Sequence, residues 1–272
     1  MKLFLRSGIA IIGISLLAIS CKRENVASIN EVPQDVMKKI EAQGFSTENV
    51  RKVDRGYLVE GDIVLTNENL NSQSVSPNLL IATDEQYRTT NLVKALPRTI
   101  TVSVSGTLSG LAVWSNATDA LISRYNALNL TVTFQRVASG GNVDIVGFDQ
   151  GPSGGYITLG SSGFPTSGGD PYNQIKMNTN TQAYGANPNQ GYITSVLQHE
   201  MGHCIGFRHT DYFNRALSCG GSKSNERAGT IGAILIPGTP SGFDAESFML
   251  ACSAGTDRTF NANDVIALNY LY

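Results

Sequence analysis

The chain has 272 residues, of which 41% are hydrophobic, so it has enough apolar content for a substantial core. Its 20 basic and 22 acidic residues nearly cancel, and the net charge is −2 at pH 7. This balance argues against a nucleic-acid-binding surface, which needs an excess of lysine and arginine. The composition is that of an exported globular protein without internal repeats or coiled-coil heptads, and we expect a monomer.

The N-terminus is predicted to be a secretory signal covering residues 1–20. Its apolar stretch, 9–19, follows a basic start and is too short to cross a bilayer as a permanent helix. Ser20 and Cys21 follow this stretch. Together with its last residues they resemble a bacterial lipobox, with Ala18 in place of the usual leucine. Acylation of Cys21 would make the chain a bacterial cell-envelope lipoprotein, at the outer membrane or cell surface, held to the membrane by lipid alone. The alternative is an ordinary secreted protein cut near Ser20.

Residues 21–95 hold few core residues, and we assign them to a propeptide or N-terminal region. A helix is predicted over 32–44, where Pro33 stands in the first turn and Gly44 ends the pattern. One strand is predicted over 56–66, followed by polar sequence.

A larger domain is predicted over 96–272. It opens with a half-buried, alternating strand at 98–105 and a helix at 114–128 whose apolar residues recur at helical spacing. A strand, a helix and further strands predict a twisted, mainly parallel sheet backed by helices, which is an α+β fold of α/β-like character. The further strands are predicted at 130–136, 143–148 and 172–178.

The glycine- and serine-rich stretch 137–170 contains Asp144, Asp149 and Asp170. Such loops can hold Ca²⁺, but the spacing matches no dedicated calcium loop. We therefore interpret the stretch as connections between short strands, and calcium binding is not supported.

All three histidines of the chain lie in one short window with the spacing H-E-x-x-H-x-x-G-x-x-H. On a helix His199 and His203 project from one face and can share a metal, and Gly206 permits the positive φ that turns the chain back towards His209. Three imidazoles leave the fourth position of a zinc ion open, as in catalytic sites, and Glu200 stands where a general base is needed. A bare H-E-x-x-H also arises by chance, but the added glycine and third histidine argue against chance.

This window resembles the metzincin metallopeptidases, and residues 199–211 are most similar to the bacterial dual-action HEIGH metallopeptidases, with Met201 in place of isoleucine. The resemblance covers most of the chain beyond about residue 55. It implies a methionine turn beneath the zinc, for which Met249 is the one methionine after the window. Core filling is the alternative role for Met249. Ala251 stands where astacins and serralysins have a tyrosine ligand.

The resemblance also implies a metzincin catalytic domain over 96–272, with the zinc helix (189–205) as the floor of the cleft and a small C-terminal subdomain. The last strand before the zinc helix, predicted at 172–178, should be antiparallel and pair with an extended substrate. An ordinary edge strand is the alternative. A last helix is predicted from Ala262, capped by Asn261.

The segment Val59-Glu60-Gly61-Asp62 resembles the astacin propeptide motif Phe-x-Gly-Asp, with valine in place of the aromatic residue. The resemblance implies that Asp62 occupies the open zinc position and keeps the chain latent. The alternative is that the glycine and aspartate only close a hairpin turn. Activation would need a cut near Arg88, Lys94 or Arg98.

Three cysteines remain besides Cys21. Cys204 lies within the zinc helix and is interpreted as a small buried hydrophobe. Cys219 and Cys252 lie in irregular segments of an exported protein, and we predict a disulfide between them, with two free thiols as the alternative.

These residues predict an endopeptidase with one catalytic Zn²⁺ and a peptide or protein substrate. Glu200 would take a proton from the zinc-activated water and return it to the leaving amine. Asp211 is a candidate acceptor for a ligand imidazole, with loop capping as the alternative. Two other functions stay open: a catalytically silent cell-surface binding lipoprotein, and an amidase acting on cell-wall peptides. The presence of the glutamate and all three histidines argues against the first.

Overall fold

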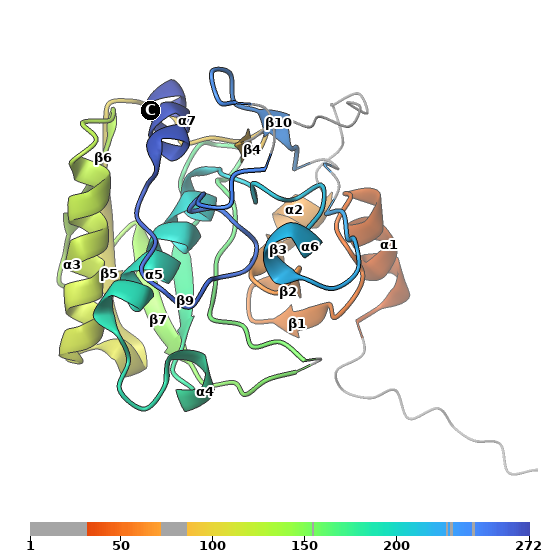
Figure 1. Ribbon diagram of the computed structural model, residues 1–272, viewed down its shortest axis with the longest axis horizontal. Coiled ribbons are helices and arrows are strands. Elements are labelled where there is room, and N and C mark those ends of the chain that lie inside the picture. Colours follow the sequence, from red (N-terminus) through yellow and green to blue (C-terminus); the bar gives the residue numbers. More distant parts are fainter. Residues whose placement is uncertain (1–31, 72–85, 154, 227, 229–230, 241–242) are drawn as a thin grey trace, which may run out of the picture. The chain divides into compact units, whose positions relative to one another are not determined.

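A five-stranded sheet with the order β6-β5-β7-β9-β8 forms the centre of the computed structural model, which describes residues 32–71, 86–153, 155–226, 228, 231–240 and 243–272 (Figure 1). The predicted signal and the Cys21 lipidation site lie outside these residues. Strand β5 pairs in parallel with β6 and β7, and β7 pairs in parallel with β9, whereas β8 is antiparallel to β9. The prediction of a mainly parallel sheet with helices is therefore confirmed. The strands are β5 (Arg98–Val104), β6 (Val132–Arg136), β7 (Val143–Phe148), β8 (Gly160–Ser161) and β9 (Gln174–Asn178).

The prediction for the last strand before the zinc helix was wrong in its direction. This strand is β9, and it lies inside the sheet, parallel to β7. The antiparallel edge strand is β8, which the sequence analysis took for part of a glycine-rich connection. A strand of two residues shows no alternation that a sequence pattern could reveal.

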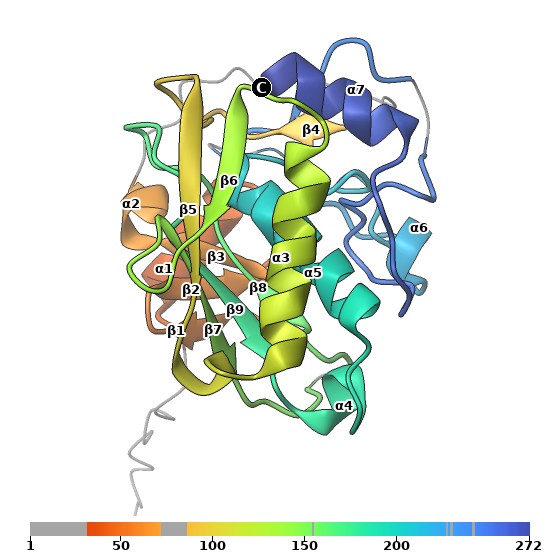
Figure 2. The ribbon, with the colours of Figure 1, turned by 90° about the vertical axis from the view of Figure 1, so that its left-hand side faces the viewer.

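Two long helices, α3 (Ala112–Asn126) and α5 (Gln190–Ile205), pack on one face of this sheet (Figure 2). Trp114, Leu121 and Tyr125 of α3 are buried, as the helical spacing predicted. Short helical segments connect the main elements: η1 (Gly106–Leu108), α4 (Thr181–Tyr184) and α6 (Ala216–Cys219). Within the described ranges no helix has the length and apolar content needed to cross a membrane.

The N-terminal region forms a small three-stranded antiparallel sheet, preceded in the sequence by one helix and followed by another. The single strand predicted over 56–66 was wrong, because the chain turns back at Glu60 and Gly61, whose φ angles are +56° and +98°. Glycine adopts such angles at little cost, so the turn depends on Gly61. The elements are α1 (Gln34–Ala42), β1 (Arg51–Val53), β2 (Gly56–Val59), β3 (Ile63–Thr66) and α2 (Asn67–Asn71).

Residues 86–93 pack among the C-terminal elements. Strand β4 (Tyr87–Arg88) pairs with β10 (Ile234–Leu235), and Tyr87 is fully buried. The amide of Gln86 donates to Ser247 Oγ and to a carboxylate oxygen of Asp264. Asp264 also completes a capping box at the start of the last helix, α7 (Ala262–Leu271). This short segment therefore stabilises the C-terminal part of the chain.

Candidate metal centre

Helix α5 carries the first two histidines on a well-capped, largely buried scaffold. Its N-cap, Asn189, accepts a hydrogen bond from the backbone N–H of Tyr192. The helix ends at Gly206, whose φ of +113° lies in the left-handed region. The turn at Gly206 brings His209 back beside the helix, as the sequence analysis predicted.

The three imidazoles converge through their Nε2 atoms. Nε2 of His203 lies 3.1 Å from Nε2 of His209. The ring centroid of His199 lies 4.7 Å from that of His203 and 5.3 Å from that of His209. His203 and His209 are fully buried, so their close approach is built into the interior of the fold.

Each imidazole is held by an acceptor at its other nitrogen. Nδ1 of His199 lies 3.0 Å from the carbonyl oxygen of Phe248, and Nδ1 of His203 lies 2.9 Å from that of Phe207. Nδ1 of His209 lies 2.7 Å from Oε1 of Glu226. These acceptors require a proton on Nδ1, so each neutral ring directs the lone pair of Nε2 to the common point.

Asp62 supplies the fourth group at this point. Its Oδ2 lies 3.0 Å from Nε2 of His209 and 3.5 Å from Nε2 of His199. Four ligands at zinc distances of about 2.0–2.1 Å, arranged as a tetrahedron, lie about 3.3 Å from one another. Oδ1 of Asp62 is buried and has no hydrogen-bond partner in the described part of the chain. The four side chains therefore fit a zinc ion. Asp62 lies both in the segment where the hairpin turns back and within hydrogen-bond distance of His209, so the turn does not exclude an approach to a metal.

Glu200 lies directly beside this group and is 2% exposed. The hydroxyl of Ser162 donates to Oε2 of Glu200 over 2.6 Å. A Cβ at Gly160 would lie 2.8 Å from Oε1, so only glycine leaves room for the carboxylate there. Burial, and then the charge of Asp62, raise the pKa of Glu200 well above its ordinary value.

Glu226 is a site residue that the sequence analysis missed. It is almost fully buried, and besides His209 it contacts Arg208 over 3.4 Å and Arg215 over 3.3 Å. Burial alone would raise its pKa, but the positive groups around it lower it. Asp211, the acceptor considered from the sequence, instead accepts from Ser218 Oγ and the backbone of Ala251. Glu226 follows the zinc window in irregular sequence, where no pattern marks it.

Met249 and the cysteines lie around the same centre. Met249 is fully buried, and a Cβ placed on Gly202 of α5 would overlap with its sulfur atom. Cys219 and Cys252 form a disulfide, and Cys204 is a buried free cysteine. The disulfide joins the loop after the third histidine to the segment after Met249.

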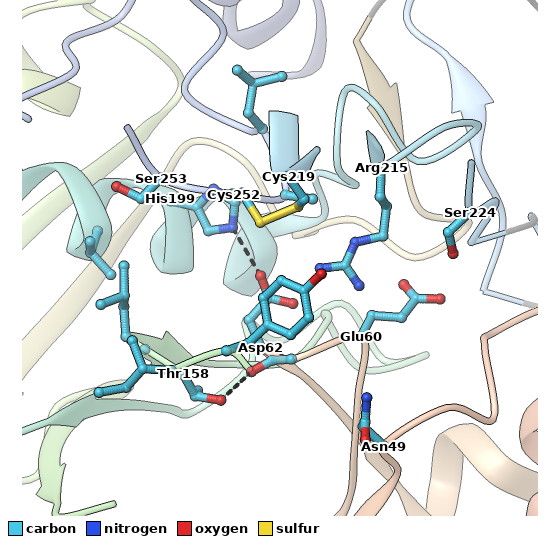
Figure 3. A pocket seen from close by; sticks show the side chains of 18 of the residues that line it. Asn49, Glu60, Asp62, Thr158, His199, Arg215, Cys219, Ser224, Cys252 and Ser253 are labelled. Carbon is cyan, nitrogen blue, oxygen red and sulfur yellow. Dashed lines mark hydrogen bonds and ion pairs between the residues drawn. A yellow bond between two sulfur atoms is a disulfide. The ribbon is translucent and has the colours of Figure 1, made fainter. Parts of the chain in front are cut away.

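A pocket of about 570 Å³ opens over the metal centre (Figure 3). Its wall includes His199, Glu200, Asp62 and Arg215. The arrangement brings together three imidazoles that could hold a metal, a buried carboxylate and space for a bound molecule. A metal-assisted hydrolysis is the chemistry that such a site can carry out.

Comparisons with known proteins agree with this reading of the site. The sequence profile of the dual-action HEIGH metallo-peptidase family matches residues 57–272, which is well over half of the chain. No curated protein matches the sequence. Two solved structures show a distant likeness that adds nothing to the assignment. Myroilysin has 13% identity and a TM-score of 0.39 over 64% of this chain and 79% of its own. High choriolytic enzyme 1, a hatching enzyme zinc-protease from the medaka fish Oryzias latipes, has 16% identity and a TM-score of 0.37 over 64% of this chain and 88% of its own. The chain belongs to the dual-action HEIGH metallo-peptidase family and is a zinc metallopeptidase.

Proposed function

We propose that the chain is an endopeptidase in which His199, His203 and His209 hold the zinc ion and Glu200 is the general base. The observation that carries this proposal is the convergence of three imidazoles, each fixed at Nδ1, beside a buried carboxylate. Zinc, when bound, supplies a Lewis acid that polarises the scissile carbonyl and makes water a better nucleophile at neutral pH.

Glu200 moves the proton in this mechanism. Its carboxylate takes a proton from the attacking water and later gives it to the nitrogen of the leaving amine. The hydroxyl of Ser162 holds Oε2, which fixes the direction of the side chain. Burial first of all raises the pKa of Glu200, which makes its carboxylate a stronger base for the proton of the attacking water.

The N-terminal region keeps the chain latent in this proposal. Asp62 lies at the fourth ligand position, which the reaction needs for water and substrate. The backbone N–H of Ser162 donates to the carbonyl of Asp62 over 3.0 Å, and the N–H of Val64 donates to the carbonyl of Ser162 over 2.7 Å. The hairpin therefore also covers the end of edge strand β8. An extended substrate would pair with this edge as an additional strand of the sheet.

Removal of the N-terminal region would activate the chain. The cuts considered from the sequence, near Arg88, Lys94 or Arg98, lie within or after the segment that pairs with β10. Because Tyr87 is fully buried and Gln86 binds Asp264, we propose that the mature domain begins at or before Gln86. The boundary at 95/96 predicted from the sequence would remove these contacts.

Three further predictions remain proposals. Met249 forms the methionine turn beneath the zinc, where its buried sulfur packs on Gly202. The chain is exported behind the signal 1–20. Cys21 is lipidated, which places the peptidase at the cell envelope, with secretion as the alternative.

The experiment that tests the function uses the folded full chain, cut by a specific protease whose recognition sequence is inserted within 72–85. The product is incubated with a peptide library, casein and peptidoglycan, with and without a chelator. We expect cleavage within peptide chains that the chelator stops and zinc restores. Release of peptidoglycan fragments without peptide cleavage would show an amidase instead, and no hydrolysis by the zinc-loaded protein would refute the proposal.

A further inference from the structure

Arg215 places a positive charge in the wall of the pocket, close to the metal centre (Figure 3). Its Nε lies 3.3 Å from Oε1 of Glu226. Neither of its terminal nitrogens has a hydrogen bond or an ion pair with any residue that the structure describes. The side chain lines the pocket and about a fifth of it (21%) is exposed (Figure 3).

The backbone holds Arg215 firmly in this position. Its N–H donates to the carbonyl of Ser224 over 2.8 Å, and its carbonyl accepts from the N–H of Cys219 over 2.9 Å. Cys219 ends α6 and is joined by the disulfide to Cys252. The guanidinium is therefore presented by a cross-linked part of the pocket wall, as a recognition group requires.

Four carboxyl groups surround this cation. Burial lowers the pKa of Arg215, but the charges of Glu226, Asp62, Glu60 and Asp211 together raise it above its ordinary value. Glu226 is already engaged by His209 and Arg208, and Asp211 accepts from Ser218 and Ala251. Glu60 and Asp62 belong to the N-terminal hairpin.

The hairpin presents these two acidic residues to the pocket from positions two apart. Glu60 is 5% exposed, and one of its carboxyl oxygens accepts from the N–H of Ser46 over 3.1 Å. The other oxygen is buried without a hydrogen-bond partner in the described residues. When the hairpin leaves, Arg215 loses both of these acidic neighbours, and its free donors line an open pocket beside the metal.

We propose that Arg215 is a specificity-determining residue that binds a carboxylate of the substrate next to the scissile bond, so that the activated peptidase prefers acidic peptides. This inference rests on the proposed peptidase function. The planar guanidinium offers two parallel N–H groups, which match the two oxygens of a carboxylate. The carboxylate comes either from an aspartate or glutamate side chain or from the free C-terminus of a peptide.

The test compares peptides that differ in one carboxylate, using the full chain folded and then cut within 72–85 as above. Glutamate, glutamine and lysine are placed in turn at each position around the cleaved bond. A second set ends in a free carboxylate or in an amide, which separates the two sources. At one position we expect kcat/KM for the carboxylate to exceed that for the neutral analogue by roughly 10- to 100-fold, as for a hydrogen bond to a charged group.

Variants of Arg215 then identify the group responsible. Arg215→Gln should abolish the preference by slowing cleavage of the acidic peptide alone, and Arg215→Lys should restore part of it. Arg136→Gln is the matched control, because Arg136, at the end of β6, pairs with the exposed Asp119 of α3. A binding readout uses the Glu200→Gln variant with zinc, in which calorimetry should give the same preference as a ratio of Kd values, lost when Arg215→Gln is added.

The outcomes separate the two proposals. Equal slowing of acidic and neutral peptides by Arg215→Gln would show that Arg215 only supports Glu226, and would overturn the inference. A wild-type enzyme that cleaves peptides without any carboxylate preference would overturn it as well, while the peptidase function stands. If no peptide is cleaved, the proposed function fails, and the Kd ratio still decides whether Arg215 binds carboxylates.

Discussion

Oε1 of Glu226 lies 2.7 Å from Nδ1 of His209, and both side chains are almost fully buried. The carboxylate fixes the orientation of the third ligand and makes its Nε2 a stronger donor to the metal. Glu226→Gln should weaken zinc binding by about 10- to 100-fold, the effect typical of lost outer hydrogen bonds at metal sites.

Competition with a chromophoric chelator measures this loss, and near-UV circular dichroism shows whether the fold is kept. Glu246→Gln is the control, since Glu246 is exposed. Unchanged zinc affinity in a folded Glu226→Gln variant would show that Glu226 serves only its two arginine neighbours.

Glu200→Gln should separate metal binding from turnover. Glutamine keeps the shape of the side chain and its contact with Ser162, but it cannot accept a proton. We expect bound zinc in the normal ratio and a fall in kcat of at least about 100-fold, the usual size of general-base catalysis. Elemental analysis and peptide cleavage measure the two properties. Retention of most activity would rule Glu200 out as the base.

Asp62→Ala should give an uncut chain with measurable peptidase activity, because the fourth ligand position opens and one contact of the hairpin is lost. Activity remains below that of the cut enzyme, since the backbone pairing with Ser162 persists. Asp54→Ala is the control in the same region, where Asp54 forms an exposed pair with Lys176. A zinc-loaded Asp62→Ala chain that is fully latent would exclude the aspartate switch.

Gly202→Ala should destabilise the fold by about 1–3 kcal/mol through overpacking. The new methyl group would overlap with the sulfur of Met249 and lie 2.8 Å from a ring carbon of Phe248, and both of these side chains are buried. Urea denaturation measures the change. Gly151→Ala is the control, because a Cβ there meets nothing within 4 Å. Equal stability of the two variants would show that Met249 is loosely packed.

Replacing both Cys219 and Cys252 by alanine should lower the free energy of unfolding by about 4 kcal/mol, the chain-entropy effect of closing a loop of this length. The cysteines are separated by 33 residues. Denaturation of the oxidised wild type and the double variant gives the difference, and mass mapping of a non-reduced digest identifies the bridge. Free thiols in the wild-type protein would contradict the pairing.

The zinc window could be predicted because its geometry is local. His199 and His203 lie one helical turn apart, and the left-handed Gly206 determines where His209 returns. The partners of the imidazoles could not be predicted, because they come from distant segments. Glu226 and the carbonyl of Phe248 reach the site only through the folded C-terminal part.

In the fold, too, elements set by local sequence could be predicted, whereas contacts between distant segments could not. Long strands and helices with clear periodicity, such as α3 and β7, were predicted nearly to their ends. The division of 56–66 into two paired strands was predicted only as an alternative, and the two-residue strand β8 was missed, because short elements form through pairing with other segments. The packing of Gln86 with Asp264 is likewise a contact between remote parts of the chain.

The acceptors of the three imidazoles have a consequence for the order of maturation. They are Phe207, Phe248 and Glu226, so one comes from the turn after the zinc helix and two from later segments of the chain. A chain in which these later segments are not yet folded lacks the acceptors from Phe248 and Glu226. We expect such a chain to bind zinc weakly. We therefore expect tight zinc binding, and with it hydrolytic activity, only after these later segments have folded against the zinc helix.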